Sequence, residues 1–240
     1  MAQKREVDPG LLKDWRFYPE NMGTHYLLVS GINPHTGREN QFTTRGKGRE
    51  KGATRIPFKF RFPKATAAAR KIGRSMRDKY GMFELLKRLR EEDYFRELSD
   101  FEVPLMVMPR AAEKTCGWEI NAPGGTADPG ESMEQIGDRE FEEEGKGLKA
   151  IKLWRPFPPA MPASGAYDEI QEVTFALVYG EPSTLPEGAR EWMGFNLGEI
   201  IDEMWKYNIN PSAERPPFDA KLAWTFPYLI EKMKNELDLK

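Results

Sequence analysis

The sequence is poor in the residues that form disulfides and soft-metal sites. Its 240 residues include one cysteine, Cys116, and two histidines, His25 and His35. A single cysteine excludes an intrachain disulfide and indicates a reducing compartment. No cysteine or further histidine completes a set at metal-ligand spacing, so we expect both histidines to be structural.

Long apolar runs and a strong net charge are also missing. No stretch approaches the ~20 apolar residues of a membrane span, and the opening MAQKREVDPG lacks the apolar core of a secretory signal. We therefore expect a soluble, cytoplasmic protein without a membrane partner. The formal charge of −2 argues against a globally basic nucleic-acid binder.

The most distinctive feature present is an acidic stretch from Gly124 to Gly147. Acids at this density repel one another unless cations neutralise them, and hard cations take oxygen ligands. The stretch sets two bases, Arg139 and Lys146, against eight carboxylates, which are Asp128, Glu131, Glu134, Asp138, Glu140, Glu142, Glu143 and Glu144.

This acidic stretch predicts a helix. Ser132 and Gln135 form an S-x-x-Q capping box after a loop rich in glycine and proline. At about 100° per residue, one stripe combines apolar and acidic residues: Met133, Ile136, Gly137, Glu140, Glu143 and Glu144, with Phe141 at its flank. A solvated helix would place its acids opposite its apolar residues, so the pattern favours a metal site over an acidic surface helix. Glu140 and Glu144 lie one turn apart and can share a divalent ion.

The same residues resemble the Nudix box, G-x5-E-x7-R-E-U-x-E-E-x-G-U. The match runs from Gly125 through Glu131 to Arg139-Glu140-Phe141-x-Glu143-Glu144. The closing glycine of the family pattern is Lys146 here. Gly145 and Gly147 flank it, and we expect them to end the helix in a left-handed turn shifted along the chain.

Residues around the box resemble the ADP-ribose pyrophosphatase group. The lead-in from Trp118 to Gly125, followed by Asp128-Pro129-Gly130-Glu131, is similar to W-x-L-P-G-G-x-x-D-x-G-E, with extra residues after the tryptophan. Pro162 lies close to the position of the group's marker proline. Ser164 to Glu169 is similar to its S-P-G-x-x-x-E loop, one residue shorter. The resemblance covers about Phe101 to Leu229.

This resemblance implies a Nudix-type α/β/α sandwich with a mixed sheet. It also implies Mg²⁺-dependent hydrolysis of ADP-ribose or a related nucleoside diphosphate sugar, with Mn²⁺ as an alternative metal. The implied metal ligands are Glu140, Glu143, Glu144 and the Gly124 carbonyl. Arg139 would orient carboxylates, and Glu131 would brace the loop. A homodimer is expected from the family alone.

Three further site residues are hypotheses. The general base of the group often follows a long strand, where Glu187 and Glu191 both lie, and Glu191 is our candidate. Arg110, directly after a predicted strand, is a candidate phosphate contact. Glu169 is a candidate ligand or metal contact, with a solvated turn acid as the alternative.

Two alternatives to this function stay open. Within the enzyme class, the substrate is another nucleotide-linked diphosphate, such as NADH, a dinucleoside polyphosphate or an RNA cap. Outside it, the protein is a Nudix-fold sensor that binds a nucleotide without cleaving it. The change at Lys146 and a predicted helical insert over residues 66–98 would support this alternative.

We expect an N-terminal extension over 1–100 and a Nudix domain with a C-terminal helix over 101–240. The extension begins with an extended arm, followed by a hairpin formed by His25–Ile32 and Gln41–Thr44. A basic stretch, Arg45–Lys64, is interpreted as a flexible loop entering an edge strand, with RNA or phosphate binding as the alternative. Helices broken near Gly81 follow over Thr66–Leu98, the first capped by Thr66.

In the Nudix domain we predict five strands. They cover Glu102–Pro109, Cys116–Asn121, Ile151–Pro156, Ile170–Tyr179 and Met193–Leu197. A helical segment begins at Ile200–Trp205, and the closing helix over Phe218–Leu237 is predicted to be interrupted at Pro227.

Overall fold

The structure, a computed structural model, describes residues 12–18, 27–44, 51–76, 81–109, 117–159 and 170–239. Its contacts divide the chain into two compact units. The first comprises Met1–Ala53, Gly124–Arg139 and Phe157–Glu172, and the second comprises Thr54–Pro123, Glu140–Pro156 and Val173–Lys240.

The N-terminal part forms a three-stranded antiparallel sheet of β1 (Lys13–Tyr18), β2 (Leu27–Ile32) and β3 (Glu39–Thr44). The predicted hairpin is β2–β3, and its turn is closed by Asn33, whose Oδ1 accepts hydrogen bonds from the amides of His35 and Thr36. β1 was missed, because its polar sequence was interpreted as an extended arm.

The larger sheet has seven strands. Its order is β10-β5-β4-β9-β8, with β6 paired to β5 and β7 paired to β4. The strands are β4 (Lys51–Phe60), β5 (Phe101–Pro109), β6 (Trp118–Asn121), β7 (Gly124–Thr126), β8 (Lys149–Trp154), β9 (Ile170–Tyr179) and β10 (Glu191–Asn196). The five strands predicted in the second part of the chain are all present, with ends shifted by a few residues.

The prediction of an edge strand in the basic stretch is wrong. β4 lies between β5 and β9, and residues 52–60 are all buried. Phe58 and Phe60 are core residues, so neither is available to stack on a nucleic-acid base. The strand also buries Arg55 and Lys59, which are 4% and 7% exposed.

Among the described residues, four α-helices lie wholly within the second unit: α1 (Pro63–Ser75), α2 (Met82–Glu91), α4 (Ile200–Ile209) and α5 (Ala220–Leu237). The break near Gly81 is confirmed, since Gly81 is the N-cap of α2. The first helix begins at Pro63 instead of after Thr66, because proline suits the first helical position. Among the residues that the structure describes, no helix is long and apolar enough to cross a membrane.

The predicted interruption at Pro227 is wrong, because α5 continues through it. Pro227 lies on the exposed side, where water can satisfy the carbonyl that loses its partner. Phe226 and Leu229 are fully buried and hold the helix in place.

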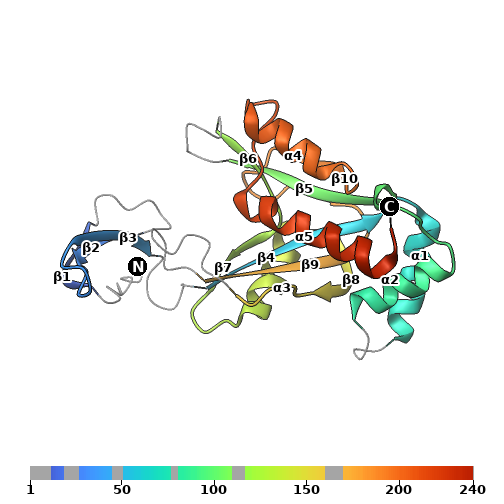
Figure 1. Cartoon of the computed structure of the whole chain (residues 1–240), viewed down its shortest axis with the longest axis horizontal. Helices are drawn as coiled ribbons and strands as arrows, with labels where there is room; N and C mark the ends of the chain where they lie inside the picture. The colour runs from blue at the N-terminus through green and yellow to red at the C-terminus, as the bar shows by residue number, and fades with distance from the viewer. Residues whose placement is uncertain are drawn as a thin grey trace. The chain divides into compact units, whose positions relative to one another are not determined.

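Alternate residues of β9 define the two faces of the sheet. Phe175 and Leu177 belong to the main core, in which Phe226 of α5 lies 6.2 Å from Phe175 between ring centroids. Figure 1 shows α5 running across the strands. Ala176 and Val178 point to the opposite face and pack against Phe141. Helices therefore cover both faces of the sheet.

Candidate active site

The acidic stretch forms the helix α3 (Met133–Glu144), and its N-terminus is fixed as predicted. The Ser132 amide donates to Gln135 Oε1 at 2.8 Å, and the Gln135 amide donates to Ser132 Oγ at 3.3 Å. This reciprocal capping box satisfies two amides that a helix start would otherwise leave without a partner.

Arg139 and Glu131 form a two-pronged ion pair that connects the helix to the preceding loop. Arg139 Nε and Nη2 each donate to one Glu131 oxygen at 3.0 Å. Arg139 Nη2 also donates to the Thr126 carbonyl at 2.9 Å, and Glu131 accepts the Asp128 amide at 2.7 Å. Arg139 therefore orients the Glu131 carboxylate, and Glu131 connects the loop before α3 to the helix.

The hydrogen bond from Arg139, followed by that from the Asp128 amide, lowers the pKa of Glu131 below its ordinary value of 4.5. A lowered folded-state pKa gives stability that is present above the unfolded-state pKa and lost as pH falls through the folded-state value. We expect Glu131→Gln to lower the free energy of unfolding at pH 7, because it removes the ion pair with Arg139. The loss should be only about 1 kcal/mol, because the pair is partly exposed.

The deficit of Glu131→Gln should shrink as the pH is lowered from 5 to 3. Urea denaturation of both proteins across this range measures it, with Glu134→Gln, an exposed acid of the same helix, as the comparison. A deficit that does not change with pH would contradict the assigned ion pair.

The acids on the C-terminal half of α3 differ in exposure. Ile136, Gly137 and Phe141 are buried, Glu140 and Glu144 are half-buried, and Glu142 and Glu143 are exposed. The inward placement predicted for Glu143 is therefore wrong. At about 100° per residue, Glu143 lies about 160° from the buried Phe141, whereas Glu144 lies only about 60° away.

The helix ends at Glu144, and a turn with a left-handed glycine follows it. Gly147 has φ +95°, in the left-handed region, and Lys146 beside it is exposed. The Lys146 carbonyl accepts the Ser183 amide at 2.7 Å. Of the two glycines expected to end the helix in a left-handed turn, Gly147 is left-handed and Gly145 is not; the turn with Gly147 follows α3, which ends at Glu144.

Arg55 is a neighbour of α3 that the sequence analysis missed. Its guanidinium carbon lies 5.7 Å from the centroid of the Phe141 ring, and its amide donates to the Pro123 carbonyl at 2.8 Å. Arg55 belongs to a run of eight bases that we interpreted as a flexible loop entering an edge strand. The contact with Phe141 follows from the burial of β4, which that run does not indicate.

The remaining predicted site residues are scattered or lie outside the described residues. Gly124 begins β7, and Glu191 is exposed on β10, where Arg190 Nη2 pairs with it at 2.8 Å. Glu187 is exposed in the loop before it. Arg110 and Glu169 fall outside the described residues, as does the loop from Pro162 to Glu169.

The donor set on α3 fits a hard divalent cation. Among the residues that the structure describes, no group of three or more His, Cys, Asp or Glu side chains is placed to hold a metal ion. Glu140 and Glu144 nevertheless offer carboxylates one turn apart. Mg²⁺ is commonly held by one or two carboxylates, with water and substrate phosphates completing its shell, so these two residues fit it.

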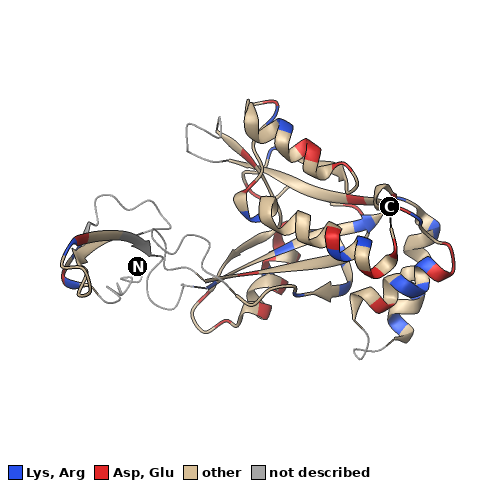
Figure 2. Cartoon of the chain, in the orientation of Figure 1, with Lys and Arg blue, Asp and Glu red and all other residues tan. Residues whose placement is uncertain are grey.

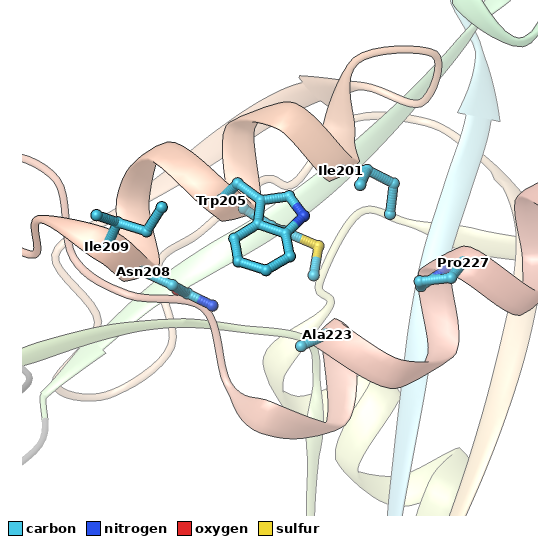
Figure 3. Close-up of a pocket in the computed structure, with 7 residues that line it drawn as sticks. Ile201, Trp205, Asn208, Ile209, Ala223 and Pro227 are labelled. Carbon is cyan, nitrogen blue, oxygen red and sulfur yellow. The ribbon is translucent and has the colours of Figure 1, made fainter.

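An apolar groove of about 330 Å³ lies elsewhere in the second unit, between α4 and α5. Trp205 lies between Ile201 and Ile209 along α4, and Ala223 and Pro227 of α5 face it (Figure 3). Asn208 also lines the groove, and its Oδ1 accepts the Phe218 amide at 2.8 Å. Among the described residues that line the groove none is charged, so it lacks the cationic side chains that a phosphate group favours.

Comparison with known proteins identifies the fold. No family model matches the sequence, and neither does any curated protein. Among solved structures, the chain is similar to one described as an ADP compounds hydrolase, with a TM-score of 0.52 and 15% sequence identity over 97% of this chain and 98% of that one. The fold is of the Nudix type. At 15% identity the similarity shows the fold alone, a mixed sheet with flanking helices. This confirms the predicted fold class.

Proposed function

We propose that this protein is a Mg²⁺-dependent pyrophosphohydrolase. Its proposed substrate is ADP-ribose or a related nucleoside diphosphate sugar, and its products are AMP (or another nucleoside monophosphate) and a sugar phosphate. The observation that carries the proposal is the pair of half-buried carboxylates, Glu140 and Glu144, one turn apart on a helix braced by the Glu131–Arg139 pair. The solved neighbour, an ADP compounds hydrolase, supports it.

The proposed chemistry follows from the charge of the substrate. A diphosphate repels an attacking hydroxide, and a bound divalent ion supplies charge neutralisation and an activated water. Glu140 and Glu144 would hold that ion, and the exposed Glu143 would reach it through water. In the overall reaction the oxygen of water bonds to one phosphorus and the bond from that phosphorus to the bridging oxygen breaks. The other phosphate leaves with the bridging oxygen, and the two protons of water are shared between the two phosphate products or pass to solvent.

Glu191 is the candidate general base. Arg190 contacts its Oε1, so Oε2 is the oxygen that would accept the proton. Glu187, exposed in the preceding loop, is the alternative. Replacing each residue by Gln distinguishes the two candidates, since only the substitution that removes the base should lower kcat with little change in KM.

A substrate panel tests the proposal. The full chain is incubated with Mg²⁺ and ADP-ribose, NADH, a dinucleoside polyphosphate or capped RNA, and the products are identified by mass spectrometry. We expect AMP and ribose 5-phosphate from ADP-ribose, and neither when Mg²⁺ is chelated. Cleavage of a different diphosphate alone would reject the substrate and retain the reaction. Tight binding of a nucleotide without cleavage of any compound would contradict the enzyme and indicate a sensor.

A further inference from the structure

We propose that a basic pocket between α1 and β8 binds the phosphate group of a small anionic ligand. This α1–β8 pocket has a volume of about 270 Å³. Three of its lining residues are bases, Arg70, Arg74 and Lys152, and none is acidic. All its residues belong to the second unit, and none lies on α3, so the inference does not rest on the proposed function.

The helix α1 concentrates positive charge. It contains Lys64, Arg70, Lys71 and Arg74 and no acidic residue (Figure 2). Arg70 and Arg74 lie one turn apart and both line the pocket, an arrangement of like charges that destabilises an isolated helix. Within the described part of the chain neither forms an ion pair. An anion between them would convert this repulsion into attraction.

Arg70 is held in place for such a contact. Its guanidinium carbon lies 4.1 Å from the centroid of the Tyr179 ring, and its Nε is buried without a hydrogen-bond acceptor among the described residues. A guanidinium fixed against an aromatic ring loses little further freedom on binding. Its planar array of donors suits a phosphate group, to which such charge-assisted hydrogen bonds are strong.

The fold packs α1 directly against β8 at Gly73. A Cβ at Gly73 would lie 2.8 Å from Ile151 Cγ2, so a larger residue there would force the helix or Ile151 to shift. Glycine inside a helix is less favourable than alanine, and the close packing accounts for its presence. The approach places the two arginines that flank Gly73 beside the strand.

The strand β8 is irregular at the same place. Its pairing with β9 shifts register between Ala150 and Lys152. In a regular strand, successive side chains alternate between faces, whereas a bulge breaks this alternation and re-aims a side chain. Residues 150–152 all line the pocket, and Lys152 joins the arginines of α1 there.

The chemistry of the pocket favours a compact phosphate over a large ligand. Its volume lies just below the range of about 300–1,000 Å³ typical of sites for drug-sized molecules. The nearby acids Glu102 and Glu181 are paired with Lys59, at 3.4 Å and 2.6 Å, so they do not occupy the arginines. Inorganic phosphate and the phosphate end of a small metabolite share the chemistry that these bases recognise.

Isothermal titration calorimetry of the full chain, in EDTA and at constant ionic strength, tests the inference with inorganic phosphate and with ribose 5-phosphate as probes. We expect saturable binding of at least one probe. Each of Arg70→Gln and Arg74→Gln should raise the Kd about 10-fold or more, as expected for the loss of a charge-assisted hydrogen bond. Binding of phosphate by itself would identify the free anion as a ligand, and binding of ribose 5-phosphate alone would identify an organic monoester.

Lys71→Gln is the matched control, because Lys71 is an exposed base of the same helix that does not line the pocket. It should leave the Kd unchanged. Circular dichroism checks the fold of each variant, and the exposed Arg74 is the site least able to disturb it. The absence of saturable binding for both probes, or an equal loss in Lys71→Gln, would overturn the inference.

Discussion

Glu144→Gln is expected to lower the rate of ADP-ribose hydrolysis by about 10²- to 10⁴-fold, since a metal ion contributes several kcal/mol to the transition state and each 1.36 kcal/mol is a factor of ten. Gln keeps the size of the side chain and removes the charge that holds the ion. The loss should appear mainly in kcat, and raising the Mg²⁺ concentration should recover part of it. Steady-state assays of AMP release over a Mg²⁺ series measure both effects.

Glu142→Gln is the matched control for this prediction. It removes an acid from the same turn of α3, but Glu142 is exposed and Glu144 is half-buried. Its rate should stay within about twofold of the unsubstituted protein, since an exposed surface charge changes little. Equal losses in the two variants would mean that general helix charge matters and that Glu144 holds no ion.

Gly147→Ala is expected to destabilise the fold by at least about 3 kcal/mol, because backbone strain and a steric clash add at this residue. Its φ of +95° is unfavourable for any residue with a side chain. A Cβ there would also lie 2.1 Å from the Glu181 carbonyl oxygen and 2.8 Å from the Ser183 amide nitrogen, both backbone atoms. Guanidinium denaturation measures the loss.

Gly130→Ala separates the two contributions. Gly130 has a similar φ of +92°, but nothing lies within 4 Å of a Cβ built there. Only the strain, about 1–2 kcal/mol, should then remain. Losses of the same size at Gly130 and Gly147 would show that the helix exit is not packed as tightly as described.

Local signals in the sequence predicted the part of the site that local chemistry determines. The capping box of Ser132 and Gln135 and the left-handed turn at Gly147 each depend on residues close together in the chain. The pairing of Arg139 with Glu131 was not predicted, although the two residues are only eight apart. The strands β5 and β9 were also predicted, because continuous apolar runs bounded by turn residues are a strong signal.

Features set by long-range pairing could not be predicted in the same way. The sequence of β4 predicts an alternating, basic strand. Its central position in the larger sheet depends on pairing with β5 and β9, which the local sequence does not show. Lys59 is buried because Glu181, 122 residues away, supplies its partner. Glu143 was misplaced because it lies at the margin of a stripe whose centre only the packing of Phe141 defines.

Titration of Mn²⁺ followed by electron paramagnetic resonance tests, without relying on activity, the claim that the carboxylate face of α3, Glu140 and Glu144, holds a divalent ion. The full chain should bind Mn²⁺ saturably, Mg²⁺ should compete, and Glu142→Gln should bind as well as the unsubstituted protein. The double variant Glu140→Gln/Glu144→Gln should lose at least about tenfold in affinity, the change that 1.4 kcal/mol produces. Unchanged Mn²⁺ affinity in the double variant would contradict the claim.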